Sequence, residues 1–512
     1  MINKPHPSAR RRSREKNKMA DDCLRNIIGS CNTVHGMKFV RNPDLPLGHR
    51  ILWLSLLLLA VVGVIFGGLE IWSAYSQSVT ATTIHTTMYQ YANTGFPSVT
   101  LCQASRIDWD RVGKLNLSSY STEVQADIHQ LLKVLSTLKF GQFNDLHRVR
   151  RLKHFEQLNQ LDLNDLLYNT QHSCADIFAD LQCWWRTTFL NCCDIFEPQK
   201  SLYGYCLAFN SDVSEISKEA SLHYGLEDSR SYWLDATLTP RPRRAANHGP
   251  WSGLRFTIEV PEIPPGVHAK RGVHLIITDP SNHPFEAGIF IPVNTLGDVS
   301  IWGDAIQTSA RVSELSRTKR TCLFAWDETK LSRGYLRENC KVHCIQDAML
   351  THCGCVPHFL FYILDEEKEQ LPACNVEGML CLAKHRDYFN NFLPERPRQA
   401  ESELRHNEVG IYCDCPDNCK SQNYISKLVI SKDAQSPSQL VLDIHYETPH
   451  CILYETDIIF GFLDALVAYG GIAGLFLGAS VLSLMEIGFE IVLQVFKITR
   501  SLLITKTQNK EN

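Results

Sequence analysis

Two long apolar runs dominate the pattern of hydrophobic and polar positions along the 512-residue chain. The first run covers residues 51–69 and contains one serine and no charged residue. A hydrocarbon core of about 30 Å needs roughly 20 helical residues, so we expect a transmembrane helix over residues 51–71. A cleaved signal peptide has an apolar region of only about 7–15 residues near the N-terminus. Fifty residues precede this run, which favours a span that stays in the protein.

The second run lies near the C-terminus, where the twenty-one residues 465–485 carry no charge. We expect a second transmembrane helix within residues 458–487. On a continuous helix, at about 100° per residue, four acidic or small residues share one face: Asp464, Gly471, Gly478 and Glu486. Such a stripe is typical of a cation pore. Gly470, Gly474 and Gly478 are also spaced four apart, which is typical of close helix packing, so both interpretations stay open.

The region between the two runs mixes strand and helix patterns. Three segments have the alternation or the β-branched residues of strands: 79–89, 253–260 and 273–278. Residues 123–140 carry apolar side chains at helical spacing, after a candidate capping box formed by Thr122 and Gln125. Residues 333–369 also predict a helix. We therefore expect one α+β domain with many loops.

Charge is distributed unevenly along the chain. Residues 1–50 carry a net charge of +7 and residues 488–512 one of +2, so residues 51–487 carry −13. Basic residues beside a span stay in the cytoplasm, which places both termini there and residues 72–457 outside the cell. Five segments follow: the arm 1–50, the spans 51–71 and 458–487, the extracellular domain 72–457 and the tail 488–512. The acidic domain argues against nucleic-acid binding, while the basic arm suits contact with membrane lipid.

Seventeen of the nineteen cysteines fall in the expected extracellular domain, and only Cys23 and Cys31 lie in the arm. Because disulfides persist in oxidising compartments, this distribution favours disulfide bonds. Some spacings, such as that of Cys353 and Cys355, also suit a metal site, which is the alternative. Seventeen is odd, so at least one extracellular thiol is free or bonds to another chain. Asn116 begins the only N-glycosylation sequon.

The sequence lacks the usual enzyme signatures. It contains no Walker loop, no GxGxxG that opens a helix, no HExxH and no GxSxG, and its histidines pair with nothing at useful spacing. We therefore expect no catalysis and no bound cofactor or metal. A pore formed by two spans per chain would need several copies, because one copy cannot enclose a conduit.

Five separated motifs resemble the degenerin/epithelial sodium channel family, and the chain looks like its pickpocket-like branch. They are the pair His35 and Gly36 and the segments 96–102 (FPSVTLC), 203–210 (YGYCLAFN), 440–447 (LVLDIHYE) and 470–480 (GGIAGLFLGAS). The resemblance implies a trimeric channel whose two transmembrane helices flank an extracellular domain with palm, finger and thumb regions. It also implies that segment 440–447 is the last palm strand before the membrane.

The resemblance further implies a disulfide framework that the sequence alone does not choose. It pairs Cys102 with Cys206, Cys322 with Cys419, Cys340 with Cys415, Cys344 with Cys413, Cys353 with Cys381 and Cys355 with Cys374. The remaining extracellular cysteines stay unassigned: Cys174, Cys183, Cys192, Cys193 and Cys451.

Three groups of pore residues follow from the same resemblance. The selectivity filter is Gly478, Ala479 and Ser480, where a break in the helix offers backbone carbonyls to sodium. The pore acidic residues are Asp464, Glu486 and Glu490. The gating residues are His35, Gly36, Val467, Gly470 and Gly471. Val467 stands where the family typically has a small residue whose enlargement holds the gate open.

The function implied is that of a sodium-selective, amiloride-blockable channel subunit of the plasma membrane. Sodium is then the permeant ion, no cofactor is needed, and related subunits are the partners in a homo- or heterotrimer. Two alternatives remain, a non-conducting two-span receptor or adhesion protein and an ATP-gated trimeric receptor-channel. The stimulus stays open among mechanical, osmotic and chemical signals, and the extracellular ligand is unknown.

Two sequence features bear on gating. The carboxylates at 365–369 would suit proton sensing, although a solvated face is the simpler interpretation. The basic segments 241–244 (RPRR) and 317–320 (RTKR) fit protease cleavage patterns, with ordinary basic loops as the simpler account.

Overall fold

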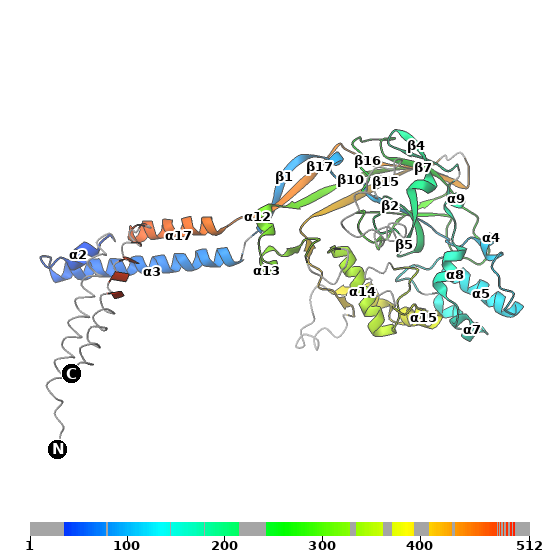
Figure 1. Ribbon diagram of the computed structural model, residues 1–512, viewed down its shortest axis with the longest axis horizontal. Helices are drawn as coiled ribbons and strands as arrows, with labels where there is room; N and C mark the ends of the chain where they lie inside the picture. Colours follow the sequence, from blue (N-terminus) through cyan, green and yellow to red (C-terminus); the bar gives the residue numbers. More distant parts are fainter. Residues whose placement is uncertain are drawn as a thin grey trace, which may run out of the picture. The chain divides into compact units, whose positions relative to one another are not determined.

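The computed structural model describes residues 35–77, 80–143, 145–178, 180–214, 242–327, 334–361, 371–393, 409–432 and 436–478, with Ser480 and a few single positions beyond it. The chain forms two compact units, residues 1–81 with 457–512 and residues 82–456. We call them the helical unit and the large unit. Figure 1 shows the elements of each.

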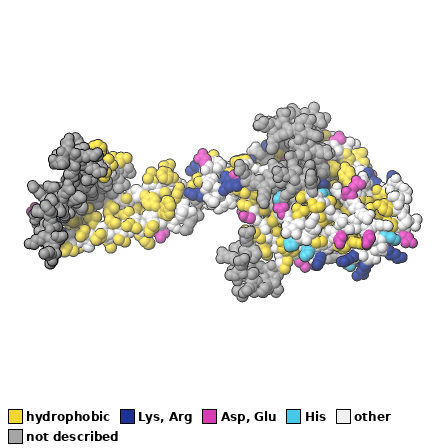
Figure 2. Space-filling view, turned by 60° about the horizontal axis from the view of Figure 1, so that its bottom comes forward, with side chains coloured by type: hydrophobic (Ala, Val, Ile, Leu, Met, Phe, Trp, Pro, Cys, Tyr) yellow, Lys and Arg dark blue, Asp and Glu magenta, His cyan; other side chains and the backbone are white. Residues whose placement is uncertain are grey.

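The helical unit contains the described helices α2 (Met37–Arg41), α3 (Leu47–Gln77) and α17 (Phe462–Leu477). The first apolar run lies inside α3, whose most apolar stretch of 18 residues has a mean hydropathy of 2.6. At about 1.5 Å per residue, its 31 residues measure about 46 Å, which exceeds the hydrocarbon thickness. Among the described helices only α3 is long and apolar enough to cross a membrane, because α17 has 16 residues. Figure 2 shows the apolar side chains gathered along this unit.

The large unit is built on two sheets. The eight-stranded sheet has the order β1-β17-β10-β16-β7-β3-β4, with β15 also paired to β10. Its strands are β1 (Thr80–Gln90), β3 (Gln182–Trp185), β4 (Thr188–Asn191), β7 (Leu254–Glu259), β10 (Thr295–Thr308), β15 (Ser421–Lys432), β16 (Gln439–Tyr446) and β17 (His450–Ile458). The five-stranded sheet has the order β5-β6-β2-β8-β9. Its strands are β2 (Ser98–Gln103), β5 (Phe196–Ser201), β6 (Gly204–Phe209), β8 (Gly272–Thr278) and β9 (Ile289–Pro292).

Strand β10 organises the larger sheet. It pairs antiparallel with β15 from Thr295 to Ile306 on one edge. On its other edge it pairs parallel with β16 as far as Ile301 and then parallel with β17 from Asp304 onward. Buried and half-buried residues alternate along β10, as expected for a strand with one face on a core. The two sheets share an apolar core that includes Val99 of β2 and Phe256 of β7.

Helices cover a second core in the large unit. The longer ones are α5 (Thr122–Leu135), α8 (Leu163–Thr170), α14 (Arg337–Cys353) and α15 (Val376–Lys384). The short ones are η2 (Tyr91–Asn93), α4 (Trp109–Val112), α6 (Leu146–Val149), α7 (Phe155–Asn159), α9 (Cys174–Ile177), α10 (Cys192–Ile195), α12 (Ala310–Ser313), α13 (Arg317–Arg320) and α16 (Arg386–Asn390). Two small two-stranded sheets pair β11 (Cys322–Leu323) with β14 (Asp417–Asn418) and β12 (Phe392–Leu393) with β13 (Ile411–Tyr412).

The expected mixture of helices and strands is found, but three local expectations are wrong. The N-cap of α5 is Ser121, whose hydroxyl accepts a hydrogen bond from the Val124 N–H at 3.4 Å, so Thr122 already lies inside the helix. Of the helix expected over 333–369, the described residues form α14, which ends at Cys353 because Gly354 takes a left-handed conformation at φ 69°; residue 333 and residues 362–369 lie outside the described part. Segment 440–447 is not the last strand, since β17 follows β16 along β10.

A buried ionic pair joins β16 to β7. Asp443 is 3% exposed, and its carboxylate accepts hydrogen bonds at 3.1 Å from Arg255 Nη1 and from the Trp251 N–H. Burial alone would raise the pKa of Asp443, but the neighbouring His445 and the hydrogen bonds from Trp251 and Arg255 lower it below the usual 3.8. The native carboxylate is therefore stabilised in its charged form.

Eight disulfides staple the large unit. Six of them are the pairs that the family resemblance implied, from Cys102–Cys206 to Cys355–Cys374. The other two, Cys174–Cys193 and Cys183–Cys192, account for four cysteines that sequence reasoning left unassigned. Cys353 and Cys355, whose spacing would suit a metal site, are thus each bonded to another cysteine, which contradicts the metal alternative. Cys451 is a free, buried thiol.

Candidate functional site

The arm before α3 folds back on the end of α17. The backbone N–H of His35 donates to the carbonyl of Leu477 at 3.0 Å. Gly36 is the N-cap of α2, with φ at 88°, a left-handed conformation that glycine adopts without steric cost. His35 therefore meets the start of the expected filter segment, across more than 400 residues of sequence, and Gly36 turns the chain directly after it.

Gly478 ends α17 under two separate constraints. Its φ is 61°, and its N–H donates to the Gly474 carbonyl at 2.9 Å as the cap of the helix. A Cβ at this position would overlap the imidazole of His35. Only glycine satisfies both the backbone conformation and the close approach.

An aromatic contact holds the arm against α3. The rings of Phe39 and Trp53 stack with their centroids 4.5 Å apart. A Cβ on Gly36 would lie 3.4 Å from the Trp53 ring, and Arg50 Nε donates to the Val40 carbonyl at 3.0 Å. The Trp53 ring thus packs on the arm. The position of His35 is thus fixed through α2 and α3.

Helix α3 packs against α17 through glycines that sequence reasoning missed. A Cβ added to Gly63 would lie 2.8 Å from the Phe476 ring, and one added to Gly67 would lie 2.8 Å from Ile472. The hydroxyl of Tyr469 donates to the Gly68 carbonyl at 2.9 Å. Gly63 and Gly67 are spaced four apart, so the small-residue signal was present in the first run.

The expected gating residues of α17 lie away from α3. A Cβ added to Gly470 or Gly471 would meet no atom within 4 Å, and Val467 is 74% exposed. Gly470 and Gly471 therefore do not pack on the first helix of the same chain.

The acidic and filter residues are only partly described. The Asp464 carboxylate accepts a hydrogen bond from the Gly461 N–H at 2.9 Å, which caps the start of α17. Ser480 is described and exposed. Three expected pore residues lie outside the described residues: Ala479, Glu486 and Glu490.

Two expected modification sites of the large unit differ in accessibility. Asn116 is exposed, and its side-chain oxygen accepts a hydrogen bond from the Ser118 hydroxyl at 2.7 Å. The basic segment at 317–320 forms α13, and Arg320 is 5% exposed with Nη2 2.5 Å from both Asp327 oxygens. Burial alone would raise the pKa of Asp327, but the hydrogen bond from the Phe324 N–H and the interaction with Arg320 lower it.

The other basic segment is also fixed in place. Arg243 is 1% exposed, and its guanidinium lies 4.9 Å from the centroid of the Phe209 ring. Its N–H donates to Asn210 Oδ1 at 2.6 Å, and its carbonyl accepts from the Phe96 N–H at 2.7 Å. Arg241 and the carboxylates at 365–369 lie outside the described residues. A protease would have to unfold either segment locally to reach the peptide bond after its last arginine.

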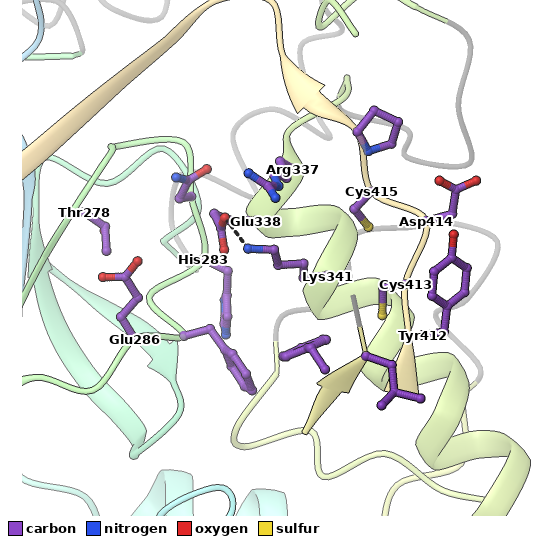
Figure 3. Close-up of a pocket in the computed structure, with 15 residues that line it drawn as sticks. Thr278, His283, Glu286, Arg337, Glu338, Lys341, Tyr412, Cys413, Asp414 and Cys415 are labelled. Carbon is purple, nitrogen blue, oxygen red and sulfur yellow. Dashed lines mark hydrogen bonds and ion pairs between the residues drawn. The ribbon is translucent and has the colours of Figure 1, made fainter. Parts of the chain in front are cut away.

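A cavity of about 670 Å³ opens beside α14 (Figure 3). Glu338 and Lys341 of α14 form an ion pair of 2.7 Å within it. Cys413 and Cys415 line the wall that disulfides tie to α14. Burial raises the pKa of Glu286, and the neighbouring Glu338 raises it further, while Lys341 opposes both effects. Glu338 and Lys341 thus balance each other within the cavity, while Arg337 pairs with Asp417 outside its lining.

These features define a membrane-protein class with an apolar helix of spanning length and a large, disulfide-rich α+β unit. Residues 29–489 match the family described as Amiloride-sensitive sodium channel. The chain therefore belongs to the amiloride-sensitive sodium channel family, as its sequence motifs suggested.

Individual relatives span most of the chain. It is 26% identical to Pickpocket protein 19 of Drosophila melanogaster, over 90% of this chain and 88% of that protein. It is 21% identical to Sodium channel protein Nach of the same species, over 89% of this chain and 84% of that protein. Pickpocket protein 28 is 20% identical, over 92% of this chain and 78% of that protein.

Proposed function

We propose that the chain is a subunit of a sodium-selective, amiloride-blockable cation channel of the plasma membrane. The observation that carries the proposal is the contact of His35 with Leu477 and Gly478, in a chain that belongs to this family over residues 29–489. Membership of the family favours a channel over a non-conducting receptor and over the ATP-gated class. Sodium is the permeant ion, and the chain needs no cofactor for this function.

The two faces of α17 support a pore-lining role. Tyr469, Ile472 and Phe476 recur at helical spacing and meet the glycines of α3. At about 100° per residue, Val467 and Gly471 lie on the opposite side of α17. Each copy would present this small-residue face to the others around a central pore, with α3 on the lipid side.

Three copies, identical or related, would enclose the conduit, since α3 and α17 of one chain cannot. The path would narrow where α17 ends, at Gly478, Ala479 and Ser480, and the chain would complete its second span beyond Leu477 within residues 458–487. Both basic termini would lie in the cytoplasm and the large unit outside, where its disulfides persist. The stimulus stays open among mechanical, osmotic and chemical signals, and a sensory role suits this arrangement.

The proposal is tested by voltage clamp of cells that express the chain with Val467→Phe. We expect a standing sodium current that amiloride blocks and that a large organic cation does not replace, because the bulky ring would hold the pore-side face open. Leu466→Phe is the matched control, since Leu466 is also exposed on α17 but one position around the helix. It should produce no standing current.

Ser480→Ala in the Val467→Phe background then tests the filter. A changed preference among sodium, lithium and potassium would support its place in the narrow segment. Absence of current from a chain shown to be at the cell surface as an oligomer would refute the homomeric channel.

A further inference from the structure

A run of basic residues covers part of the large unit between α6 and α7. Residues 145–154 contain one carboxylate, on Asp145, and four cations: Arg148, Arg150, Arg151 and Lys153. Their net charge is +3 with both histidines neutral, and +2 when the following Glu156 is counted. Residues 51–487 together carry −13, so this segment is opposite in sign to the region that contains it. A basic cluster of this length is typical of a surface that binds polyanions.

The packing of apolar side chains leaves these cations in solvent. Leu146 and Val149 are buried in the core that α5 also covers, and Leu152 packs against the same core. These three residues recur at every third position, and the residues between them are exposed: His147, Arg148, Arg150 and Arg151, with Lys153 directly after Leu152. Figure 1 shows α5 and α7 side by side in this part of the large unit. The fold therefore directs the basic side chains outward.

Three of the four cations have no counter-charge within the described part of the chain. They are Arg150, Arg151 and Lys153. The nearest carboxylates are engaged elsewhere, because Asp145 pairs with Arg148 at 3.3 Å and Asp127 pairs with His154 at 2.9 Å. Neighbouring like charges repel one another, so an anion that neutralises them would bind favourably.

A small cleft extends this basic surface to two other segments. It has a volume of about 80 Å³, and its lining includes Lys133 of α5, Asp145, Arg148 and His268 of the loop before β8. A Cβ added to Gly266 would lie 3.4 Å from Lys133 Nζ, so this loop lies against α5. Lys133 has no ion pair among the described residues, and the lining carries a net charge of +1 with His268 neutral. Because one water needs about 10–15 Å³ of such volume, the cleft has room for one sulfate group.

The surroundings favour a linear polyanion over a protein or a membrane. Within the described residues 121–143 and 145–160, no large hydrophobic side chain is exposed. Protein partners are usually held by apolar or aromatic anchors, which this surface does not offer. Anionic lipids are concentrated in the cytoplasmic leaflet, whereas the proposed function places the large unit outside the cell. An extracellular polymer that carries sulfate groups fits both conditions.

We propose that residues 147–153 and the cleft beside Lys133 bind an extracellular sulfated polysaccharide. Arg150, Arg151 and Lys153 contact successive sulfate groups, and the cleft takes one more between Lys133 and Arg148. Residues 148–153 span at most about 20 Å, so the contact covers a short stretch of the polymer. The inference rests on the extracellular placement of the large unit in the proposed function and does not depend on conduction.

Binding is measured on the purified full-length protein in an uncharged detergent, with a heparin oligosaccharide of defined length as the probe. The N-terminal arm is also basic, so the readout is the difference between variants that leave the arm intact. Replacing Arg150, Arg151 and Lys153 together by glutamine should weaken binding at least tenfold. The affinity should also depend less on salt, because fewer counterions are released. The thermal unfolding temperature should not fall, since these side chains have no ion pair to lose.

The matched control replaces three other exposed lysines of the large unit, which also lack an ion pair among the described residues. Its substitutions are Lys384→Gln, Lys420→Gln and Lys427→Gln. The control changes the net charge by the same amount and should bind heparin as the wild type does. Equal weakening in both triple variants would overturn the proposal, because binding would then follow overall charge.

Two further probes and one variant test the chemistry of the site. Heparin stripped of its sulfate groups and polyglutamate, an acidic peptide, should each bind at least tenfold more weakly than heparin. Equal binding of the stripped heparin would refute recognition of sulfate, and equal binding of polyglutamate would replace the polysaccharide by an acidic peptide. Lys133→Gln should weaken heparin binding at least threefold, and unchanged binding would refute the role of the cleft. These measurements record no current, so their failure is distinct from a failure of the channel proposal.

Discussion

Replacing Gly478 by alanine would disrupt the contact between the arm and α17. A residue with a Cβ costs about 1–2 kcal/mol in the left-handed conformation that Gly478 adopts. The new Cβ would also displace the His35 ring, and loss of the bond from the His35 N–H to the Leu477 carbonyl costs about 1 kcal/mol more. The contact should weaken by about 2–3 kcal/mol, which is roughly 30- to 140-fold in its equilibrium constant.

Amide hydrogen exchange of the segment around α2, in the full-length protein in detergent, measures this loss without any assumption about conduction. The His35 amide should exchange faster in Gly478→Ala by about the same factor. Gly470→Ala is the matched control, because a Cβ at Gly470 meets no atom within 4 Å and the helix interior favours alanine. Its exchange should match that of the wild type.

A double-mutant cycle separates the two parts of the effect. In a His35→Ala background the overlap is gone, so Gly478→Ala should cost only the backbone part of about 1–2 kcal/mol. Unchanged protection in Gly478→Ala, or an equal loss in Gly470→Ala, would refute the contact between the arm and the end of α17.

Three further outcomes are expected. Asp443→Asn should lower the free energy of unfolding by about 3 kcal/mol or more, since it leaves the partly buried Arg255 without its counter-charge. The folded pKa of Asp443 is lowered, so the stability that its carboxylate contributes is fully present above the ordinary pKa of 3.8. That stability is lost as the pH falls through the folded pKa. The Asp443→Asn variant should lack this pH dependence. Furin should cut after neither Arg244 nor Arg320 in the folded protein, because Arg243 and Arg320 are buried, and a discrete fragment on a reducing gel would contradict that burial. Gly67→Leu should part α3 from α17 and speed amide exchange in α17, whereas an unchanged rate would show that the two helices do not pack there.

Much of the fold was predictable because its signals are local. The apolar run at 51–69 predicts α3 regardless of what surrounds it, since a stretch without charge or breaks has few other stable environments. The alternation at 253–260 likewise gives β7 to within one residue at each end. The end of α14 was missed because Gly354 stops the helix, while the apolar pattern continues past it.

The site was harder to predict because its contacts are not local. Nothing in the neighbourhood of His35 indicates that Gly478 lies beside it. The pairing of Cys183 with Cys192 similarly depends on the β3–β4 hairpin, which brings these two cysteines together although they are nine residues apart in the sequence. Four cysteines allow three connectivities, and only the folded hairpin chooses one.

The partner exchange along β10 has a mechanical consequence. β16 and β17 run in the same direction on one edge of β10, and the register shifts at the break that contains Pro449, a residue without an N–H to donate. A pull along β17 therefore loads all its hydrogen bonds to β10 together in shear, instead of peeling them one by one. Because β15 pairs with the opposite edge over twelve residue pairs, β10 would distribute a force applied to β17 among the three strands that are hydrogen-bonded to it.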